Sequence, residues 1–135
     1  MDLDMAQRLK KQSTEHDEAI RLLAQSEFDL SRYDIRTNPG KEHNHEIDGQ
    51  WPDIVALERR THTVCIVAEV ETFDSVTPQE VSQWQDYASL GYHFILYVPL
   101  GSCSKAQQLC SAAGIKPDEL KWYSVVGGTV LTDFC

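Results

Sequence analysis

Three acidic residues stand where apolar segments of the chain begin or end. Asp53 opens the segment 52–57, and Glu69 and Glu71 close the segment 63–71. Strand side chains alternate between two faces, and both faces of 63–71 are apolar before the glutamates. This pattern predicts a strand covered on both sides, where an ionised carboxylate is costly unless a cation or hydrogen bonds compensate it.

The turn between the two segments predicts how the acidic residues meet. Arg59, Arg60 and Thr61 lie between the two strands, which makes them an antiparallel pair. A turn centred near Thr61 places Asp53 opposite Glu69, with Cβ atoms about 5 Å apart on one face. A slip of one residue in this register would turn Asp53 to the other face.

A cluster of Asp53, Glu69 and Glu71 at one end of the sheet would favour a bound cation. Carboxylates this close repel one another and raise one another's pKa, and a divalent cation between them removes the repulsion. Hard oxygen ligands suit Mg²⁺ or Mn²⁺. The alternative is that Pro-Asp simply begins a strand and that Glu-x-Glu is solvated on an edge strand.

The elements that must hold these residues follow from periodicity and from turn residues. Alternating residues, apolar runs and the Pro and Gly residues between them predict a helix at 3–25 followed by strands at 27–36, 52–57 and 63–71. A helix is then predicted at 78–90, after the capping sequence Thr77-Pro78-Gln79-Glu80. The remaining predicted elements are a strand at 93–99, a helix at 104–113, and a last strand and hairpin within 121–134. We expect one α/β domain spanning residues 1–135, with a mixed central sheet flanked by helices. Strands 63–71 and 93–99 should be parallel through a right-handed crossover.

Composition narrows the class of protein. The chain has 135 residues and a formal net charge of -9. No apolar run approaches the roughly 20 residues of a membrane span. The N-terminal residues are charged and helical in pattern, which is not typical of a signal peptide. The cysteines form no metal-ligand spacing, so we expect all four to be reduced and structural: Cys65, Cys103, Cys110 and Cys135. These features predict a cytoplasmic protein without a membrane partner.

The sequence resembles the PD-(D/E)xK, or restriction endonuclease-like, nuclease superfamily over roughly residues 6–125. The resemblance rests on Pro52-Asp53 and Glu69-Val70-Glu71, on the αβββαβ element order derived above. It implies a metal-dependent nuclease that acts on nucleic acid, with DNA expected before RNA. It also implies that Asp53, Glu69 and the Val70 carbonyl hold Mg²⁺ or Mn²⁺ while Glu71 orients a water molecule or accepts its proton.

Two further elements are similar to those of particular nuclease groups. Gln83 and Tyr87 resemble the Gln-x-x-x-Tyr element of RecB-type exonucleases, which implies that Gln83 contacts phosphate or water; an ordinary amphipathic helix is the alternative. His43 or His45 could correspond to a histidine that some of these exonucleases place before the aspartate strand. On the first helix, Glu15 or Glu18 could reach the site, and the pattern does not choose between them.

One departure from the superfamily pattern leaves activity open. Glu71 stands where the superfamily has lysine, and a carboxylate cannot donate a hydrogen bond to phosphate as an ammonium does. Some restriction enzymes carry Glu there and remain nucleases. The competing interpretations are a catalytically inactive module that binds nucleic acid or protein, and an unrelated α/β protein. A homodimer is predicted from spare apolar surface at Trp51, Trp122 and the C-terminal hairpin.

Overall fold

In residues 3–40 and 42–135, which the computed structural model describes, the chain forms three α-helices and a six-stranded mixed sheet. The elements, in chain order, are α1 (Leu3–Ser26), β1 (Tyr33–Thr37), β2 (Ile54–Glu58), β3 (Val64–Val70), the 3-10 turn η1 (Pro78–Glu80), α2 (Val81–Ala88), β4 (His93–Pro99), α3 (Cys103–Ala113), β5 (Glu119–Val126) and β6 (Thr129–Phe134). The expected α/β class with a mixed central sheet is therefore confirmed.

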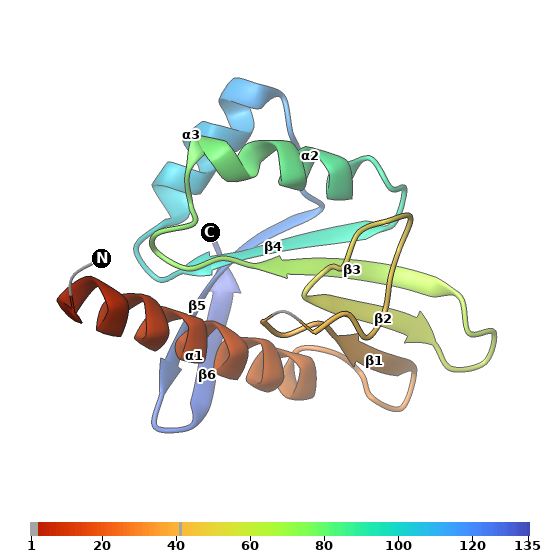
Figure 1. The fold of residues 1–135 in the computed structure, drawn as a ribbon. Coiled ribbons are helices and arrows are strands. Elements are labelled where there is room, and N and C mark those ends of the chain that lie inside the picture. The colour runs from red at the N-terminus through yellow and green to blue at the C-terminus, as the bar shows by residue number, and fades with distance from the viewer. Residues whose placement is uncertain (1–2, 41) are drawn as a thin grey trace.

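The strands lie side by side in the order in which the chain makes them. β1, β2 and β3 are antiparallel neighbours, β3, β4 and β5 are parallel, and β6 returns antiparallel to β5. The crossover helices α2 and α3 cover one face of the sheet, and α1 lies across the other (Figure 1). The predicted parallel pairing of the third and fourth strands is confirmed, as expected for strands joined by a helix.

Each face of the sheet has its own apolar core because the central strands are buried on both sides. The core on the α1 side contains Ile20, Leu23, Ala68, Val70 and Tyr97, with further residues of β2, β4 and β5. The core on the α2 and α3 side contains Val67, Trp84, Tyr87, Phe94 and Ala106, among others. Alternate residues of β3 thus enter opposite cores, and the second half of this strand, Val67 to Val70, is buried on both faces.

The expected strand at 27–36 is wrong over its first half. α1 continues to Ser26, and β1 begins only at Tyr33. Between them Asp29 organises a turn: its carboxylate accepts hydrogen bonds from the backbone and the hydroxyl of Ser31, and its carbonyl accepts one from the backbone of Arg32. Asp side chains commonly stabilise turns in this way, and the local hydrogen bonds outweigh the alternating pattern.

The helix predicted at 78–90 is shorter and begins differently. Residues 78–80 form a 3-10 turn, α2 ends at Ala88, and Thr77 makes no side-chain capping hydrogen bond. Its buried side chains are Trp84 and Tyr87, whereas Val81 and Ala88 are half-buried. The helix therefore presents its two large aromatic rings to the end of β3.

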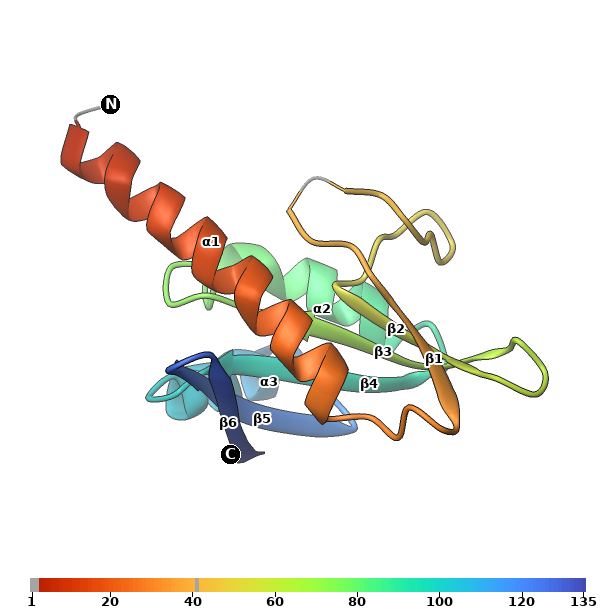
Figure 2. The ribbon, with the colours of Figure 1, turned by 90° about the horizontal axis from the view of Figure 1, so that it is seen from below.

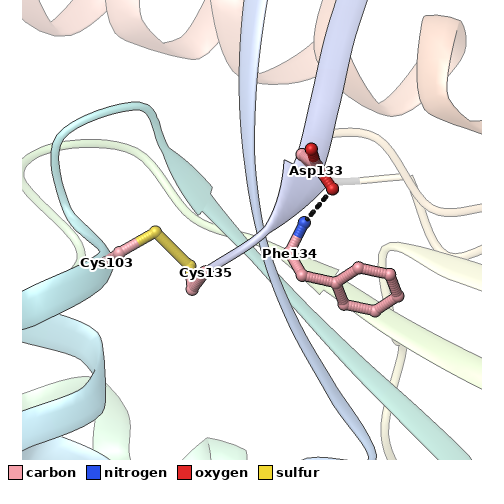
Figure 3. Close-up of a disulfide and its surroundings, with 4 residues drawn as sticks. All are labelled: Cys103, Asp133, Phe134 and Cys135. Atoms are coloured by element: carbon pink, nitrogen blue, oxygen red, sulfur yellow. Dashed lines mark hydrogen bonds between the residues drawn. A yellow bond between two sulfur atoms is a disulfide. The ribbon is translucent and has the colours of Figure 1, made fainter.

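The prediction that all four cysteines are reduced is wrong for two of them. Cys103 and Cys135 form a disulfide that joins the start of α3 to the C-terminal residue of the chain (Figure 3). Sequence spacing could not reveal this pair because the two residues are 32 positions apart and meet only when β6 returns along β5. Cys65 and Cys110 are free thiols, and Cys110 is buried.

The helix α1 is longer than the sheet that it covers. Its C-terminal part buries Ala19, Ile20 and Leu23, while its N-terminal turns extend beyond the sheet (Figure 2). The middle of the helix therefore passes the end of the sheet where β2 begins and β3 ends. None of the helices in the described ranges combines the length and apolar content that a bilayer crossing requires.

Candidate functional site

The register of β2 and β3 brings Asp53 and Glu69 together, as the sequence predicted. Ile54 pairs with Ala68 in the antiparallel ladder, so the residues before and after this pair, Asp53 and Glu69, lie across from each other. Both carboxylates are on the side of the sheet that faces α2. The structure therefore places two acidic side chains of neighbouring strands at one end of the sheet.

A bulge in β3 sets this register. Ala56 lies opposite Ile66 but Leu57 lies opposite Val64, so Cys65 has no partner of its own. An unpaired residue of this kind shifts all pairs beyond it by one position. With the pairing of Leu57 and Val64 continued unbroken, the start of β2 would be displaced by one residue and Asp53 would no longer oppose Glu69.

The carboxylates of Asp53 and Glu69 each accept a hydrogen bond from a backbone N–H group of the neighbouring chain segment. The amide N–H of Asp53 donates to Oε1 of Glu69 over 3.0 Å, and the amide N–H of Val70 donates to Oδ2 of Asp53 over 2.8 Å. Only 9% of Asp53 and 6% of Glu69 is exposed. The contacts of the Asp53 carboxylate with Val70 and His16 are both made by Oδ2; Oδ1 accepts no hydrogen bond from the described residues, and Asp53 borders the cleft described below. The Asp53 carboxylate is fixed in place with one oxygen left for a ligand.

His16 of α1 is the cationic neighbour of this pair. Its Nε2 lies 3.3 Å from Oδ2 of Asp53, and its Nδ1 lies 3.5 Å from Asp17. Burial acts to lower the pKa of His16, but the hydrogen bond to Asp53 and the charge of that carboxylate outweigh it, and the pKa rises to about 9. His16 is therefore protonated at neutral pH and offsets part of the negative charge.

The first-helix acids considered from the sequence do not join this cleft. Glu15 and Glu18 line a neighbouring pocket of about 510 Å³ between α1 and the β5–β6 hairpin. Helical geometry separates them from His16, because residues one or two positions apart do not share a face. Among the described residues that α1 contributes to the cleft, the titratable one is His16, a histidine in place of an acid.

Glu71 is held by α2 and by the loop that follows β3. The indole N–H of Trp84 donates to Oε1 of Glu71 over 3.0 Å, and the hydroxyl of Ser75 donates to Oε2. Burial raises the pKa of Glu71 to about 7, although these two hydrogen bonds act to lower it and the charges of Glu80 and Asp53 add to the increase. Glu71 is thus a buried carboxyl that changes its protonation near neutral pH.

Burial and acidic neighbours both disfavour the ionised form of Glu69. Burial raises its pKa well above the ordinary value, and the charges of Asp53 and Glu71 raise it further, while the hydrogen bonds from Asp53 and Tyr87 lower it. Gln83 donates to the Tyr87 hydroxyl over 3.2 Å, so the predicted shared face of Gln83 and Tyr87 is observed. This part of the site has more negative charge than its protein partners neutralise.

All four predicted side chains border one open cleft of about 470 Å³. Asp53, Glu69, Glu71 and Gln83 form its floor with Val70, and the remaining described lining comes from α1, from the segment 72–80 and from the segment 38–51: Gln12, Ser13, His16, Asn38, Gly40, Glu42, His43, Trp51, Thr72, Asp74, Ser75 and Glu80. Of the two loop histidines, His43 lines the cleft and His45 does not.

Asn38 fixes the segment 38–51, which lines one side of the cleft, through hydrogen bonds of its side chain. It is 3% exposed, and its side-chain amide donates to the carbonyl groups of His45 and Pro52 over 2.9 and 2.7 Å. Its side-chain oxygen accepts from the backbone N–H groups of Asn44 and His45 over 2.7 and 2.9 Å. One side chain thereby connects this loop to the residue that precedes Asp53.

Four residues of the site were missed from the sequence: His16, Asn38, Ser75 and Trp84. For His16 a signal existed, because it lies one helical turn before the buried Ile20 and so shares its face. Trp84 is a large apolar residue of the kind that fills a core, and its hydrogen bond to Glu71 depends on how α2 meets β3. Nothing in the sequence distinguished Asn38 or Ser75 from other polar loop residues.

Chemically, the cleft combines two fixed carboxylates, a carboxyl group that titrates near neutrality and a protonated imidazole. Within the described part of the chain, no group of three or more His, Cys, Asp or Glu side chains is already arranged to hold a metal ion. Asp53 and Glu69 are directed to backbone N–H groups, and Glu71 is directed to Trp84 and Ser75. Comparison of the chain with protein-family models, curated proteins and solved structures finds no match.

Proposed function

We propose that this chain is a metal-dependent nuclease that hydrolyses phosphodiester bonds of nucleic acid, DNA before RNA, on a restriction endonuclease-like core. The main support is the pair Asp53 and Glu69, two buried carboxylates that face each other in an open cleft although their charges repel. The element order from α1 to β4 agrees with the αβββαβ core of that superfamily. A cation is the ligand that this charge arrangement favours.

The residues of the cleft fit Mg²⁺ or Mn²⁺ held by Asp53 and Glu69, with the Val70 carbonyl as a further ligand. Mg²⁺ is usually bound by one or two carboxylates together with water and substrate phosphate, so a cage of three protein carboxylates is not required. The free Oδ1 of Asp53 supplies one oxygen. A cation bound at Glu69 would offset both the burial and the neighbouring charges of Asp53 and Glu71 that raise its pKa.

The protein residues then have separate parts in hydrolysis. When bound, the metal ion would lower the pKa of a water molecule and stabilise charge on phosphate. Glu71 accepts a proton at neutral pH because its pKa is about 7, and the Ser75 hydroxyl that donates to it lies at the cleft surface. Gln83 borders the same space and offers an amide to phosphate or water.

A second candidate is a catalytically inactive module of the same fold that binds nucleic acid or protein. The described lining of the cleft contains six carboxylate residues and neither Lys nor Arg: Glu42, Asp53, Glu69, Glu71, Asp74 and Glu80. In addition, both oxygens of Glu71 already accept hydrogen bonds, from Trp84 and Ser75. A site that had lost its lysine and kept Glu71 as a structural acceptor would have these features.

Metal binding and cleavage decide between the two candidates. We expect Mn²⁺ to bind in calorimetry, and DNA cleavage in Mg²⁺ or Mn²⁺ to stop on addition of EDTA. Asp53→Asn should lose metal binding and cleavage together, whereas Glu46→Gln, an exposed acid outside the cleft, should change neither. Glu71→Lys restores the superfamily pattern and should preserve or raise cleavage.

The inactive module is supported by the opposite set of results. Its signature is a protein that binds no Mn²⁺ and cleaves neither DNA nor RNA, as the wild type and as Glu71→Lys. Circular dichroism of each variant shows whether it is folded, so that loss of activity is not confused with loss of structure.

A further inference from the structure

The wall of the cleft opposite α1 carries two aromatic rings that are already stacked. The rings of His43 and Trp51 have centroids 4.0 Å apart and planes inclined by only 15°. Both rings border the cleft that contains Asp53 and Glu69. Trp51 remains 36% exposed and His43 is exposed, so the stack is not part of the core.

The position of Trp51 relative to the carboxylates is fixed by the chain itself. Only Pro52 separates it from Asp53, so the two Cα atoms are at most about 7 Å apart. The side-chain amide of Asn38 donates hydrogen bonds to the carbonyl groups of both Pro52 and His45. These two bonds fix the loop that carries His43. The residues that supply an aromatic face and a candidate metal ligand are therefore close neighbours in a fixed part of the chain, and both border the same cleft.

We propose that the His43–Trp51 stack is a binding subsite for an unpaired nucleobase, which makes single-stranded nucleic acid the substrate class of the cleft. The proposal rests on the proposed function for the position of the phosphate. A flat, polarisable face binds any base by stacking, and such contacts contribute about 1–3 kcal/mol per base. The imidazole of His43 against Trp51 shows that a planar heteroaromatic ring fits this surface.

The charge of the cleft makes stacking the more important contact. Its described lining offers phosphate no Lys or Arg, and six of its side chains are carboxylates. Recognition through backbone phosphates alone would need clustered cations. A base inside a duplex has both faces covered by its neighbours, so only a single-stranded or extruded base can present a face to Trp51.

The test compares three short phosphorothioate-linked oligothymidylates in Mn²⁺ by fluorescence anisotropy: the single strand, the same strand with abasic sites, and the duplex with oligoadenylate. We expect the single strand to bind more tightly than the other two. Trp51→Ala should weaken its binding by about 5- to 150-fold, the range that corresponds to one stacked base. Trp51→Phe should keep part of the affinity, and Trp122→Phe, on β5, should keep all of it.

Two results would overturn the subsite: equal affinity for the normal and abasic strands, or binding by Trp51→Ala that matches the wild type. These results are independent of catalysis. If the Trp51→Ala protein cleaves duplex in Mn²⁺ with an unchanged KM, the proposed subsite is contradicted and the proposed nuclease activity is supported. If the protein binds single strands through Trp51 but never cleaves them, the proposed subsite is supported and the proposed nuclease activity is contradicted.

Discussion

Nε2 of His16 lies 3.3 Å from Oδ2 of Asp53, which joins the middle of α1 to the residue that precedes β2. This contact connects the helix that covers one face of the sheet to the end of the sheet where β2 begins. It also supplies the only cationic side chain, among the described residues, that hydrogen bonds to the buried pair Asp53 and Glu69. Stability of the metal-free protein should depend on it.

We predict that His16→Ala lowers the free energy of unfolding of the metal-free protein by about 1–3 kcal/mol, because the buried Asp53 carboxylate loses its charged partner. His16→Gln, which keeps a donor near Asp53, should recover part of this loss. Urea denaturation in EDTA measures both. Equal stability of His16→Ala and wild type would show that the contact contributes nothing.

The stability of the metal-free protein should fall as pH rises from 5 to 9. The folded-state pKa of Glu71 is about 7 against an ordinary 4.5, so the folded protein binds this proton more tightly and loses that advantage as pH rises between these values. The pKa of His16 is about 9 against 6.5, so its stabilising charge is fully present below pH 6.5 and is lost as pH rises through about 9.

Each group accounts for a different part of this pH profile, so two variants separate them. Denaturation midpoints at pH 5, 7 and 9 in EDTA should decrease in that order. Glu71→Gln should make the decrease between pH 5 and 7 smaller, and His16→Gln should make the decrease between pH 7 and 9 smaller, while Glu69, whose pKa is also raised, still contributes to the fall with pH. A profile that rises with pH would contradict the assigned environments of both side chains.

Trp84→Phe should destabilise the protein by about 1–3 kcal/mol, since it leaves a buried oxygen of Glu71 without its donor. Because the hydrogen bond from Trp84 lowers the pKa of Glu71, its loss should move that pKa upward. NMR titration of the Glu71 carboxyl carbon and urea denaturation measure the two effects. Trp122→Phe is the matched control, since Trp122 is only half-buried and its indole N–H donates to no carboxylate among the described residues.

Removing the disulfide should lower the free energy of unfolding by about 3–4 kcal/mol, the loop-entropy estimate for a bridge of this span. The bridge joins residues 32 positions apart. Cys135→Ser tests this, with Cys65→Ser as a control that leaves the bridge intact. Thiol titration of the denatured protein should find the two free cysteines, Cys65 and Cys110, before reduction and four thiols afterwards. Four reactive thiols without a reductant would contradict the bridge.

Asn38→Ala should loosen the cleft wall and destabilise the fold by about 1–3 kcal/mol, because it leaves buried backbone groups of His45 and Pro52 unpaired. Hydrogen exchange of the amides of Asn44 and His45 should become faster, since both donate to Asn38. Asn44→Ala is the control, because Asn44 is exposed and its side chain bonds only at the loop surface. Unchanged exchange in Asn38→Ala would show that the loop has other anchors.

The sequence by itself determined the class of fold and the strands that carry the acidic residues. Continuous apolar runs at β3 and β4 identified strands buried on both faces, and the helix between them required a parallel pair. Period-two alternation then put Glu69 and Glu71 on one face of β3. These features are local, because they depend only on neighbouring residues and on backbone geometry.

Tertiary structure decided the partners of those residues. Asp53 lies opposite Glu69 as the turn near Thr61 predicted, but this register also depends on the unpaired Cys65, and no local pattern marks a bulge at that position. His16 reaches Asp53 only because α1 crosses the sheet at one particular angle, and Cys103 meets Cys135 only because β6 folds back along β5. Contacts between residues far apart in the chain depend on how whole elements pack, which propensity and periodicity do not encode.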